Sequence, residues 1–508
     1  MLHLLSYTLR FSFLLISFSF LLNKVGAQLR VNKSLSSNMV FQCDQPIVLW
    51  GKAKANSPVN VSFGTEKQRT KASTEGTWEV TFPKQPANSN PQFILIQSGE
   101  SSLKLENILI GEVWFCAGQS NMVMRLPKTN DFKKAQIYLQ NPQIRFFALG
   151  RSPNTKPFQS ELPKGYKPTP KNIANFYNYS SWQSCEGEGL SALSAVAYWF
   201  ANSLHRELNV PIGLIVSTLG GSAIQSWVSR DSFDKDPDLK PLLSQWIQDE
   251  SKPLQRQFRA WVEANPDYTF EQTPLHRHRP TTLFEAAVQP MKKHRISGVI
   301  WYQGEQNASS DVQRNWFKMC FPKLIESFRN NWKQPNLPFY HVQLPGYGNK
   351  NWPDFRELQR KYQSIPQTGI AITIDLGLAD EIHPKDKSPI GKRLARLALK
   401  RHYQKHNIVD QGPQIICLRI EGPQIHIEFD DSLILDTDKI LHFEMAGEDM
   451  NFYPAQAHGS KNWITLKWEP IIKPRHLRYA WKGFPRPIQL KNREGLPTSP
   501  FTLSLPKN

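Results

Sequence analysis

The sequence predicts an α/β protein, in which a parallel sheet is flanked at each end of the chain by a module of short β-strands. The chain has 508 residues, which is enough for about two to four domains. Short strand-like runs separated by Pro, Gly, Asn and Ser occur up to about residue 108 and again after about residue 414, as in β-modules. Between them, strand-like and helix-like segments alternate, which favours a parallel sheet covered by helices.

Residues 1–27 are predicted to form a secretory signal peptide. Arg10 supplies a positive charge, residues 11–22 are almost continuously apolar, and Val25-Gly26-Ala27 offers small residues for cleavage before Gln28. The apolar run is too short for a comfortable membrane span, and no later run is long enough. We therefore expect an exported protein, periplasmic, secreted or on the cell surface. The alternative is an uncleaved N-terminal anchor.

Residues 28–108 are expected to form a β-sandwich-like domain. The strand-like runs lie at 47–51, 59–63, 77–82 and 93–96. Residues 406–508 are expected to form a second β-domain, with strand-like runs at 415–420, 424–429, 440–445 and 463–468. The turn residues between these runs support both predictions.

Residues 109–405 are expected to form the parallel-sheet domain. Its predicted strands are 113–117, 211–217, 296–302, 339–344 and 370–374, and its predicted helices are 193–208, 316–332 and 390–402. Leucine and aromatic residues recur at helical intervals over about 231–270, which predicts a helical insertion.

The charge and the cysteines exclude some functions and leave others open. The formal net charge is +19, which suits acidic glycans or an anionic surface but equally serves solubility. Nucleic acid is not expected, because the chain carries an export signal and no basic cluster interleaved with aromatic residues. The five cysteines have neither a disulfide-framework spacing nor a zinc spacing. No metal or organic cofactor is predicted, and the oligomeric state is left open.

The segment Gly111-Glu-Val-Trp-Phe-Cys-Ala-Gly-Gln-Ser-Asn-Met122 is the most informative stretch of the chain. Ser120 lies just beyond a buried strand, where open α/β sheets place their ligands. A serine there acts as a nucleophile if a base comes within reach. The alternative is that Ser120 only caps the following helix.

Two further polar segments follow predicted strands of the same sheet. Gly220 and Gly221 follow strand 211–217, and their N–H groups can face an oxyanion. Gln303 follows strand 296–302, and its amide is a second candidate oxyanion donor. Glu305 is either a substrate-binding or orienting group or a buried structural carboxylate.

The segment Asp380-Glu-Ile-His-Pro384 supplies a candidate base. Asp380 is placed to hold the ring of His383 while the other ring nitrogen takes the serine proton. Glu381 is the alternative orienting group. The order of the motifs differs from the α/β-hydrolases, since Ser120 is followed by Asn121 and Met122 rather than by a Gly-x-Ser-x-Gly elbow.

With these motifs, the sequence resembles the sialate O-acetylesterases, a branch of the SGNH (GDSL-like) hydrolases. The segments that carry the resemblance are 111–122, Gly298-Val-Ile-Trp-Tyr-Gln-Gly-Glu-Gln-Asn307, Ile382-His-Pro-Lys-Asp-Lys387, Arg478-Tyr-Ala-Trp481 and Gly495-Leu-Pro-Thr-Ser-Pro-Phe501. The sequence departs from the family pattern at Leu219, Ser222, Glu285 and Glu381. The resemblance implies an SGNH three-layer parallel-sheet domain flanked by two β-sandwich-like modules.

The resemblance also implies roles for individual residues. Ser120 is the nucleophile, His383 the general base and Asp380 the orienting acid, and the oxyanion hole combines the N–H groups of Ser120 and of Gly221 or Gly220 with the Gln303 amide. Gln119, Asn121, Glu305 and Asn307 are candidates for substrate binding or support.

The predicted function is therefore that of an exported serine carboxylic ester hydrolase (EC 3.1.1), which removes O-acetyl groups from a glycan. The resemblance implies O-acetylated sialic acids as substrates. One alternative is an esterase for acetylated xylan or pectin. A second, from another class, is a non-catalytic glycan-binding protein.

Overall fold

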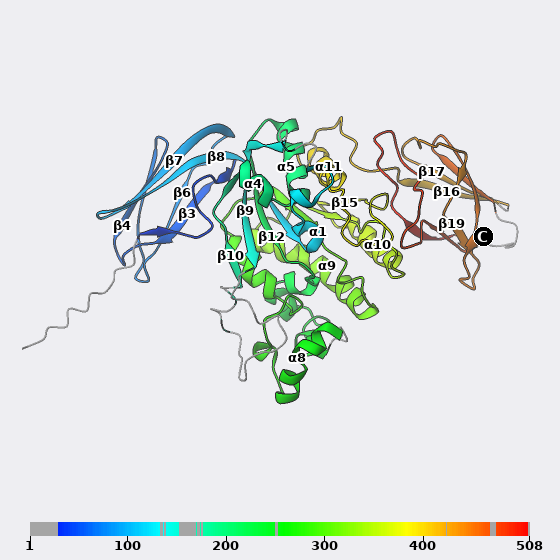
Figure 1. Ribbon diagram of the computed structural model, residues 1–508, viewed down its shortest axis with the longest axis horizontal. Coiled ribbons are helices and arrows are strands. Elements are labelled where there is room, and N and C mark those ends of the chain that lie inside the picture. Colours follow the sequence, from blue (N-terminus) through cyan, green and yellow to red (C-terminus); the bar gives the residue numbers. More distant parts are fainter. Residues whose placement is uncertain are drawn as a thin grey trace, which may run out of the picture.

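The computed structural model describes residues 29–132, 136, 139–151, 169, 173, 176–248, 252–422, 424–467 and 474–505. The predicted signal peptide, residues 1–27, lies outside the described residues. Figure 1 shows a central region of sheet and helices between two groups of β-strands, one from each end of the chain.

The central sheet consists of six parallel strands in the order β9-β12-β8-β13-β14-β15. Their bounds are β8 Ser101–Gly118, β9 Asn141–Arg151, β12 Ile212–Thr218, β13 Gly298–Tyr302, β14 Phe339–Val342 and β15 Thr368–Ala371. The short strands β10 (Tyr177–Tyr179) and β11 (Gln183–Cys185) pair antiparallel with β9. Strand β9 was not predicted from the sequence, although it pairs along almost the whole of β12.

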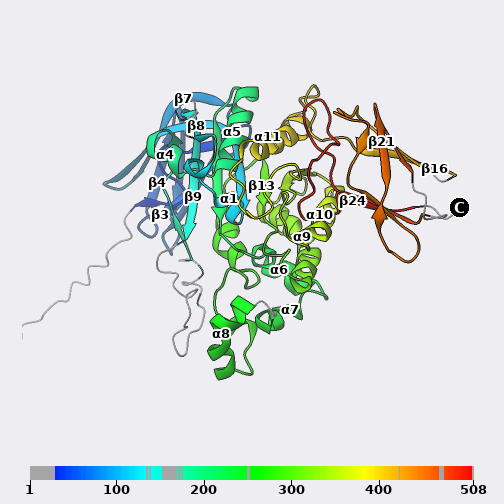
Figure 2. The ribbon, with the colours of Figure 1, turned by 45° about the vertical axis from the view of Figure 1, so that its right-hand side comes forward.

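Helices cover both faces of this sheet, which gives three layers. Adjacent residues of a strand point to opposite faces. Trp114 packs on Phe200 of α5 (Ala195–Leu208), whereas the next residue, Phe115, packs on Phe328 and Trp332 of α9 (Asp311–Trp332). Helix α11 (Ser388–Leu397) lies beside α5, as Figures 1 and 2 show.

Strand β8 connects the N-terminal strands to the central sheet without a break. It is 18 residues long. Its first part pairs antiparallel with β7 (Asn88–Ser98), and its last part pairs with β12 and β13. The strand therefore crosses residue 108, where the composition of the sequence changes.

The other N-terminal strands form antiparallel pairs on either side of a shared core. Strands β1 (Arg30–Val31), β3 (Ile47–Lys52) and β6 (Thr77–Phe82) form one sheet, while β4 (Pro58–Phe63) pairs with β5 (Glu66–Lys71) and β7. Strand β2 (Val40–Gln42) pairs parallel with β8. The polar strand β5 was not predicted, because Glu66-Lys-Gln-Arg-Thr-Lys71 has no apolar face to reveal it.

Helices occupy the region predicted as a helical insertion. They are α6 (Arg230–Lys235), α7 (Leu242–Gln245) and α8 (Lys252–Ala264). Figure 1 shows α8 projecting away from the central sheet. Three large side chains are buried there, Trp246, Phe258 and Trp261, and they belong to the same apolar cluster as the core of the central sheet.

The C-terminal strands form two antiparallel sheets over a second cluster of buried apolar residues. The first sheet has the order β16-β17-β22-β21-β18 and the second β20-β19-β23-β24. Their bounds are β16 Ile415–Glu421, β17 Gln424–Phe429, β18 Lys439–Ile440, β19 Phe443–Ala446, β20 Tyr453–Pro454, β21 Gln456–Ser460, β22 Trp463–Lys467, β23 His476–Tyr479 and β24 Phe501–Ser504. The prediction of one strand over 440–445 was wrong, because the chain turns at His442 (φ 70°) and its two halves join different sheets.

A buried arginine ties the C-terminal part to the central region. Arg356 lies on α10 (Trp352–Lys361) and is fully buried. It donates to the carbonyls of Leu344 and Pro345 at 3.0 Å and, from the C-terminal part, to that of Lys482 at 3.0 Å and to that of Gly483. Burial lowers the pKa of Arg356 to about 9, but the guanidinium stays protonated near neutral pH and keeps these bonds.

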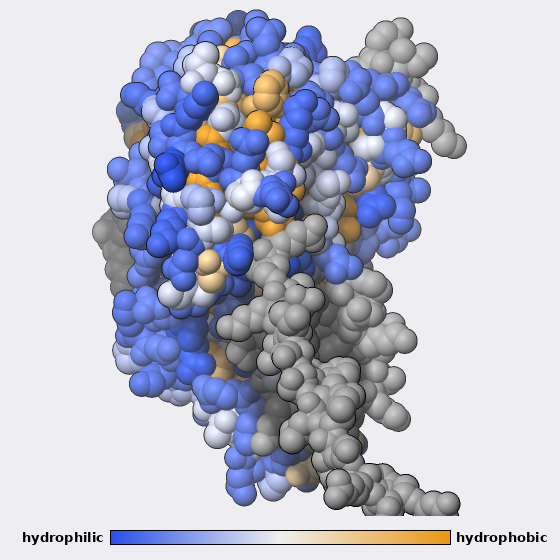
Figure 3. Space-filling model, turned by 90° about the vertical axis from the view of Figure 1, so that its left-hand side faces the viewer, coloured by the Kyte–Doolittle hydropathy of each residue, from blue (hydrophilic) through white to orange (hydrophobic). Residues whose placement is uncertain are grey.

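The surface at the N-terminal end is mainly hydrophilic, with small apolar areas between polar residues, as Figure 3 shows. Among the described residues, no helix has both the length and the apolar character needed to cross a bilayer. All five cysteines carry free thiols in the structure.

Candidate active site

Three strands of the central sheet end at the same level, and the candidate site lies just beyond them. Gly118, the last residue of β8, is aligned with Thr218 of β12 and with Tyr302 of β13. The chain turns sharply at Gly118, whose φ is 147° and where a Cβ would lie 2.1 Å from the Tyr302 carbonyl oxygen. A residue other than glycine cannot occupy this position without moving β13.

Ser120 and His383 are in direct contact across this edge. Ser120 is the first residue of the short helix α1 (Ser120–Val123), and His383 lies in the loop between β15 and α11. The Nε2 atom of His383 lies 2.8 Å from Ser120 Oγ. The structure thus brings together the predicted nucleophile and base, in the geometry that activates a serine hydroxyl.

Glu381, rather than Asp380, lies next to the ring of His383. Its Oε1 accepts a hydrogen bond from the His383 backbone N–H at 2.7 Å and lies 3.6 Å from Nδ1. Asp380 is exposed, and no hydrogen bond or ion pair joins it to His383 in the described part of the chain. In this tight turn Glu381, two residues before His383, folds back onto the histidine. Asp380, three residues before His383, faces solvent.

The pKa of His383 is lowered, first by partial burial and then by the nearby charge of Lys387, while Glu381 raises it. The imidazole is therefore neutral over more of the pH range than an exposed histidine. A neutral ring is the form that accepts a proton from a serine.

The Gly220-Gly221 turn lies against Ser120. A Cβ at Gly220 would be 3.8 Å from the Ser120 Cβ, and Gly221 has a φ of 64°. Within the described residues, no hydrogen bond occupies the backbone N–H groups of Ser120, Gly220 or Gly221. These are the donors that an oxyanion would need.

Two side chains of the segment 276–278 bind the carbonyl oxygens of this turn. Arg277 Nη1 donates to the Gly220 carbonyl at 3.2 Å, and His278 Nε2 lies 2.8 Å from the Gly221 carbonyl. Burial lowers the pKa of His278 to about 4, so its ring is neutral and Nε2 donates. The carbonyl of Gly220 and the N–H of Gly221 belong to one trans peptide and point in opposite directions. Arg277 therefore directs the Gly221 N–H away from itself.

Gln303 is placed differently from the prediction. Its amide nitrogen donates to the Ser222 carbonyl at 3.2 Å and to Asn307 Oδ1 at 2.6 Å, so both of its hydrogens are occupied. Asn307 Oδ1 also accepts from the Ile224 N–H at 2.9 Å, and its own amide donates to Gln313. Gln303 and Asn307 thus brace the turn that contains Gly221, and neither presents an N–H to an oxyanion in this structure.

Gln119 and Asn121, on either side of the nucleophile, connect neighbouring loops. Gln119 Oε1 accepts from the N–H groups of Gly304 and Gln306 at 3.3 and 3.4 Å. The Asn121 amide donates to Glu305 Oε1 at 2.5 Å and to the Ile382 carbonyl at 3.0 Å. Ser120 is therefore flanked by side chains that fix the loop after β13 and the His383 loop.

Lys387 completes this buried cluster and was not predicted. Its Nζ donates to Asn121 Oδ1 at 2.5 Å. Burial lowers the pKa of Lys387 to about 7, against the opposing charges of Glu305, Asp386 and Glu381. Burial raises the pKa of Glu305, while Asn121 and Lys387 lower it. The only sequence signal was the position of Lys387 four residues after His383, immediately before α11.

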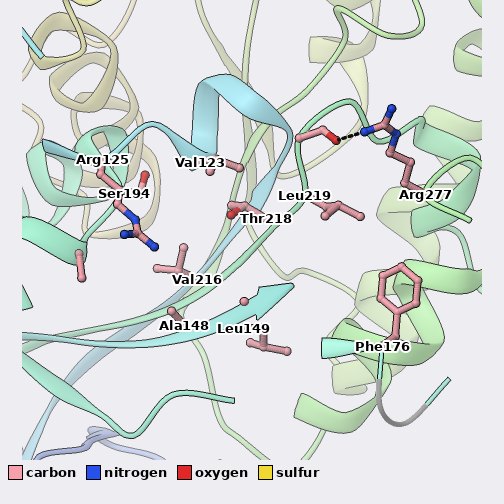
Figure 4. A pocket seen from close by; sticks show the side chains of 13 residues that line it. Val123, Arg125, Ala148, Leu149, Phe176, Ser194, Val216, Thr218, Leu219 and Arg277 are labelled. Carbon is pink, nitrogen blue, oxygen red and sulfur yellow. Dashed lines mark hydrogen bonds between the residues drawn. The ribbon is translucent and has the colours of Figure 1, made fainter. Parts of the chain in front are cut away.

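A cavity of about 370 Å³ reaches Gly220 and Val123, and a Cβ at Gly220 would lie 3.8 Å from the Ser120 Cβ. Figure 4 shows it between the strand ends, with Arg125 and Arg277 on opposite sides and Val216, Thr218 and Leu219 between them. Phe176 and Leu149 form further parts of the apolar wall. The cavity is large enough for one sugar unit beside the nucleophile.

Comparisons with known proteins find similar carbohydrate esterases. Residues 270–400 match a family model described as a carbohydrate esterase, sialic acid-specific acetylesterase. A sialate O-acetylesterase from Mus musculus is 27% identical, over 91% of this chain and 91% of that protein. The resemblance to the sialate O-acetylesterase family is confirmed. The sialate O-acetylesterase from Homo sapiens is 24% identical over 76% of this chain and 74% of its own.

A solved structure shares both the fold and the sequence similarity. A carbohydrate acetylesterase from Xanthomonas citri matches with a TM-score of 0.77 and 27% identity, covering 93% of this chain and 99% of that one. The likeness to that structure therefore extends over the central sheet and both groups of flanking strands.

Proposed function

We propose that this protein is an exported serine esterase that removes O-acetyl groups from sugars, with O-acetylated sialic acids as the first candidate substrates. The observation that carries the proposal is the 2.8 Å contact between Ser120 Oγ and His383 Nε2, beside a turn whose N–H groups at Gly220 and Gly221 carry no hydrogen bond within the described residues. The similarity to sialate O-acetylesterases supports the choice of sugar.

The proposed reaction has two acyl-transfer steps. Ser120 Oγ attacks the acetyl carbonyl carbon while His383 Nε2 takes the serine proton. The carbonyl oxygen becomes negative and receives the N–H groups of Ser120 and of Gly221 or Gly220. The carbon–oxygen bond to the sugar then breaks, and the sugar oxygen takes the proton from His383. Water, deprotonated by His383, attacks the carbonyl carbon of the acetyl-enzyme. The bond to Ser120 Oγ then breaks, His383 returns the proton to Oγ, and acetate leaves.

Glu381 is the orienting carboxylate in this proposal, in place of Asp380. It lies beside Nδ1, favours the protonated ring that forms during attack, and fixes the backbone of His383. Gln303 and Asn307 act behind the oxyanion hole by bracing the Gly221 turn.

We also propose that the central region is an SGNH-type domain over residues 109–405, flanked by sandwich-like modules at 28–108 and 406–508. The parallel strand order β9-β12-β8-β13-β14-β15 and the two groups of antiparallel strands support this division. The predicted signal peptide at residues 1–27 supports export.

The test is acetate release from O-acetylated N-acetylneuraminic acid and from acetylated xylan, measured side by side. We expect release from the sialic acid that disappears in Ser120→Ala and persists in Ser102→Ala, an exposed serine of the same strand region. Release from xylan alone would retain the mechanism and replace the substrate. Absence of serine-dependent release from both substrates and from 4-nitrophenyl acetate would favour a glycan-binding protein.

A further inference from the structure

The charged side chains among the described residues that line the cavity near Ser120 are both positive. Two arginines, Arg125 and Arg277, are among the residues that line it, and none of the lining residues that the structure describes is an aspartate or a glutamate. Hydrolysis of an acetyl ester does not require this arrangement, because the acetyl group and a neutral sugar carry no charge. The two guanidinium groups therefore point to a feature of the substrate outside the ester.

Arg125 is held at the cavity wall by its backbone. It forms an isolated β-bridge with Ser194, and the residues on either side are fixed as well, because Leu126 N–H bonds to the Leu193 carbonyl and Ala195 N–H bonds to the Met124 carbonyl. The Arg125 side chain is exposed, and among the described residues no carboxylate forms an ion pair with it. Its backbone is thus held at the cavity wall, five residues after the nucleophile, and its exposed side chain lines the cavity.

Arg277 brings a second positive charge to the opposite wall. Its guanidinium carbon lies 3.3 Å from the position that a Cβ of Gly221 would occupy, so the charged group stacks against the oxyanion turn. Its hydrogen bond to the Gly220 carbonyl fixes its place. Figure 4 shows this bond on the side of the cavity opposite to Arg125.

The surface between the arginines is mainly apolar, formed by Val123, Leu149, Phe176, Val216 and Leu219. An anion that enters such a cavity leaves water and meets positive charge in a medium of low dielectric constant, where charge pairing is stronger than in bulk solvent. The planar fork of an arginine also matches a carboxylate in a bidentate manner.

We propose that this cavity is a carboxylate subsite, in which Arg125 binds and Arg277 attracts the carboxylate of an acidic O-acetylated sugar. This inference rests on the proposed function and adds the residues that determine its specificity. A neutral acetylated sugar leaves the subsite without a counter-charge, and it is hydrolysed with a lower kcat/KM.

The test compares O-acetylated N-acetylneuraminic acid with its carboxamide, a neutral analogue of nearly the same shape, by acetate release. In the natural protein we expect kcat/KM to favour the acid by about tenfold or more, as for hydrogen bonds to charged groups. In Arg125→Gln the ratio of the two kcat/KM values is expected to fall toward one, and Arg125→Lys is expected to recover part of it. Arg69→Gln removes an exposed charge from β5 and is expected to leave the ratio unchanged.

Arg277→Gln separates two roles of that residue. If Arg277 also contributes to the subsite, the ratio of acid to amide falls; if it only holds the Gly220-Gly221 turn, both kcat/KM values fall equally and its part in the proposal is overturned. Because each ratio is measured within one variant, a loss of folded protein does not change it.

A ratio near one in the natural protein, or an unchanged ratio in Arg125→Gln, would overturn the carboxylate subsite. Such a result still leaves the esterase function standing if release from either substrate depends on Ser120. Release that does not depend on Ser120 would instead overturn the proposed function itself.

Discussion

Two groups of polar side chains meet at the nucleophile, and they differ in their exposure to solvent. Ser120, His383 and Glu381 form an open group, in which the His383 and Glu381 side chains are 39% and 45% exposed. Asn121, Glu305 and Lys387 form a buried group, each almost inaccessible to solvent. The open group is placed to exchange protons with substrate and water, whereas the buried group is placed to hold three loops at fixed positions.

The difference predicts where each kind of substitution acts. In the open group a lost interaction changes the chemistry and leaves the fold intact, because water replaces it. In the buried group a lost partner leaves a desolvated charge or polar atom, and the fold itself becomes less stable.

The largest effect is expected for His383→Ala, which removes the base. We expect kcat to fall by about 10⁴-fold or more, as in other serine hydrolases that lose a triad member, while the free energy of unfolding changes little. Acetate release and urea unfolding measure the two quantities. A variant that retained a tenth of the activity would show that His383 is not the base.

Lys387→Met is expected to have the largest effect on stability. It leaves Glu305 buried without its countercharge, and such a loss typically costs about 3–5 kcal/mol. The free energy of unfolding from urea titration is the measurement, and Lys385→Met, an exposed lysine two residues earlier, is the matched control. Equal stability of the two variants would contradict a rigid buried group.

The same variant has a distinct pH signature. The folded protein lowers the pKa of Lys387 to about 7, whereas an unfolded lysine titrates near about 10.4. Between these values the unfolded chain binds more protons, so Lys387 makes stability rise with pH. The stability of the natural protein minus that of Lys387→Met should therefore increase from pH 7 to pH 10. A flat difference would mean that Lys387 titrates normally.

Gln303→Ala is expected to have an intermediate effect. It leaves the Ser222 carbonyl and Asn307 Oδ1 without one donor each, and a buried unsatisfied group costs about 1–3 kcal/mol. If Gln303 instead donates directly to the oxyanion, kcat falls by about 10²–10³ with little change in stability. Measuring both quantities on one preparation distinguishes the bracing role from the direct one.

The smallest effect is expected for Glu381→Gln. The contact is exposed, and such pairs contribute about 0.2–1 kcal/mol, so kcat should fall by about fivefold at most. Because Glu381 raises the pKa of His383, its loss should shift the acid limb of the kcat/KM profile to lower pH. Asp380→Asn serves as the control and should move neither quantity. A larger effect in Asp380→Asn would restore Asp380 as the orienting acid.

The sequence predicted the parts of the site that depend on strand ends. Ser120, Gly221 and His383 each follow a strand with strong apolar character, and parallel strands bring such positions to one edge. It did not predict the choice between Asp380 and Glu381, because one tight turn decides which carboxylate folds back. Nor did it predict Lys387, Arg125 or Arg277, since their importance comes from burial or from facing a cavity, and neither leaves a periodic pattern.

In the fold, too, elements with a strong apolar pattern were predicted and polar or mixed elements were missed. Strands with apolar residues, such as β12 and β13, were found within two residues of their ends. Strand β5 was missed because its side chains are polar, and β9 because its apolar residues lie among Pro, Gln and Arg. The break near His442 depends on a positive φ in a residue other than glycine, which sequence patterns rarely indicate.

Strand β8 restricts how this protein can change by insertion or deletion. Because it belongs to two groups of strands at once, one added or deleted residue reverses which side chains face each core along the rest of the strand. The N-terminal β-region is therefore not a detachable module of the kind that recombination exchanges between proteins. In related chains the turns can vary in length. The number of residues in β8, which connects the N-terminal sheet to Ser120, is expected to stay the same.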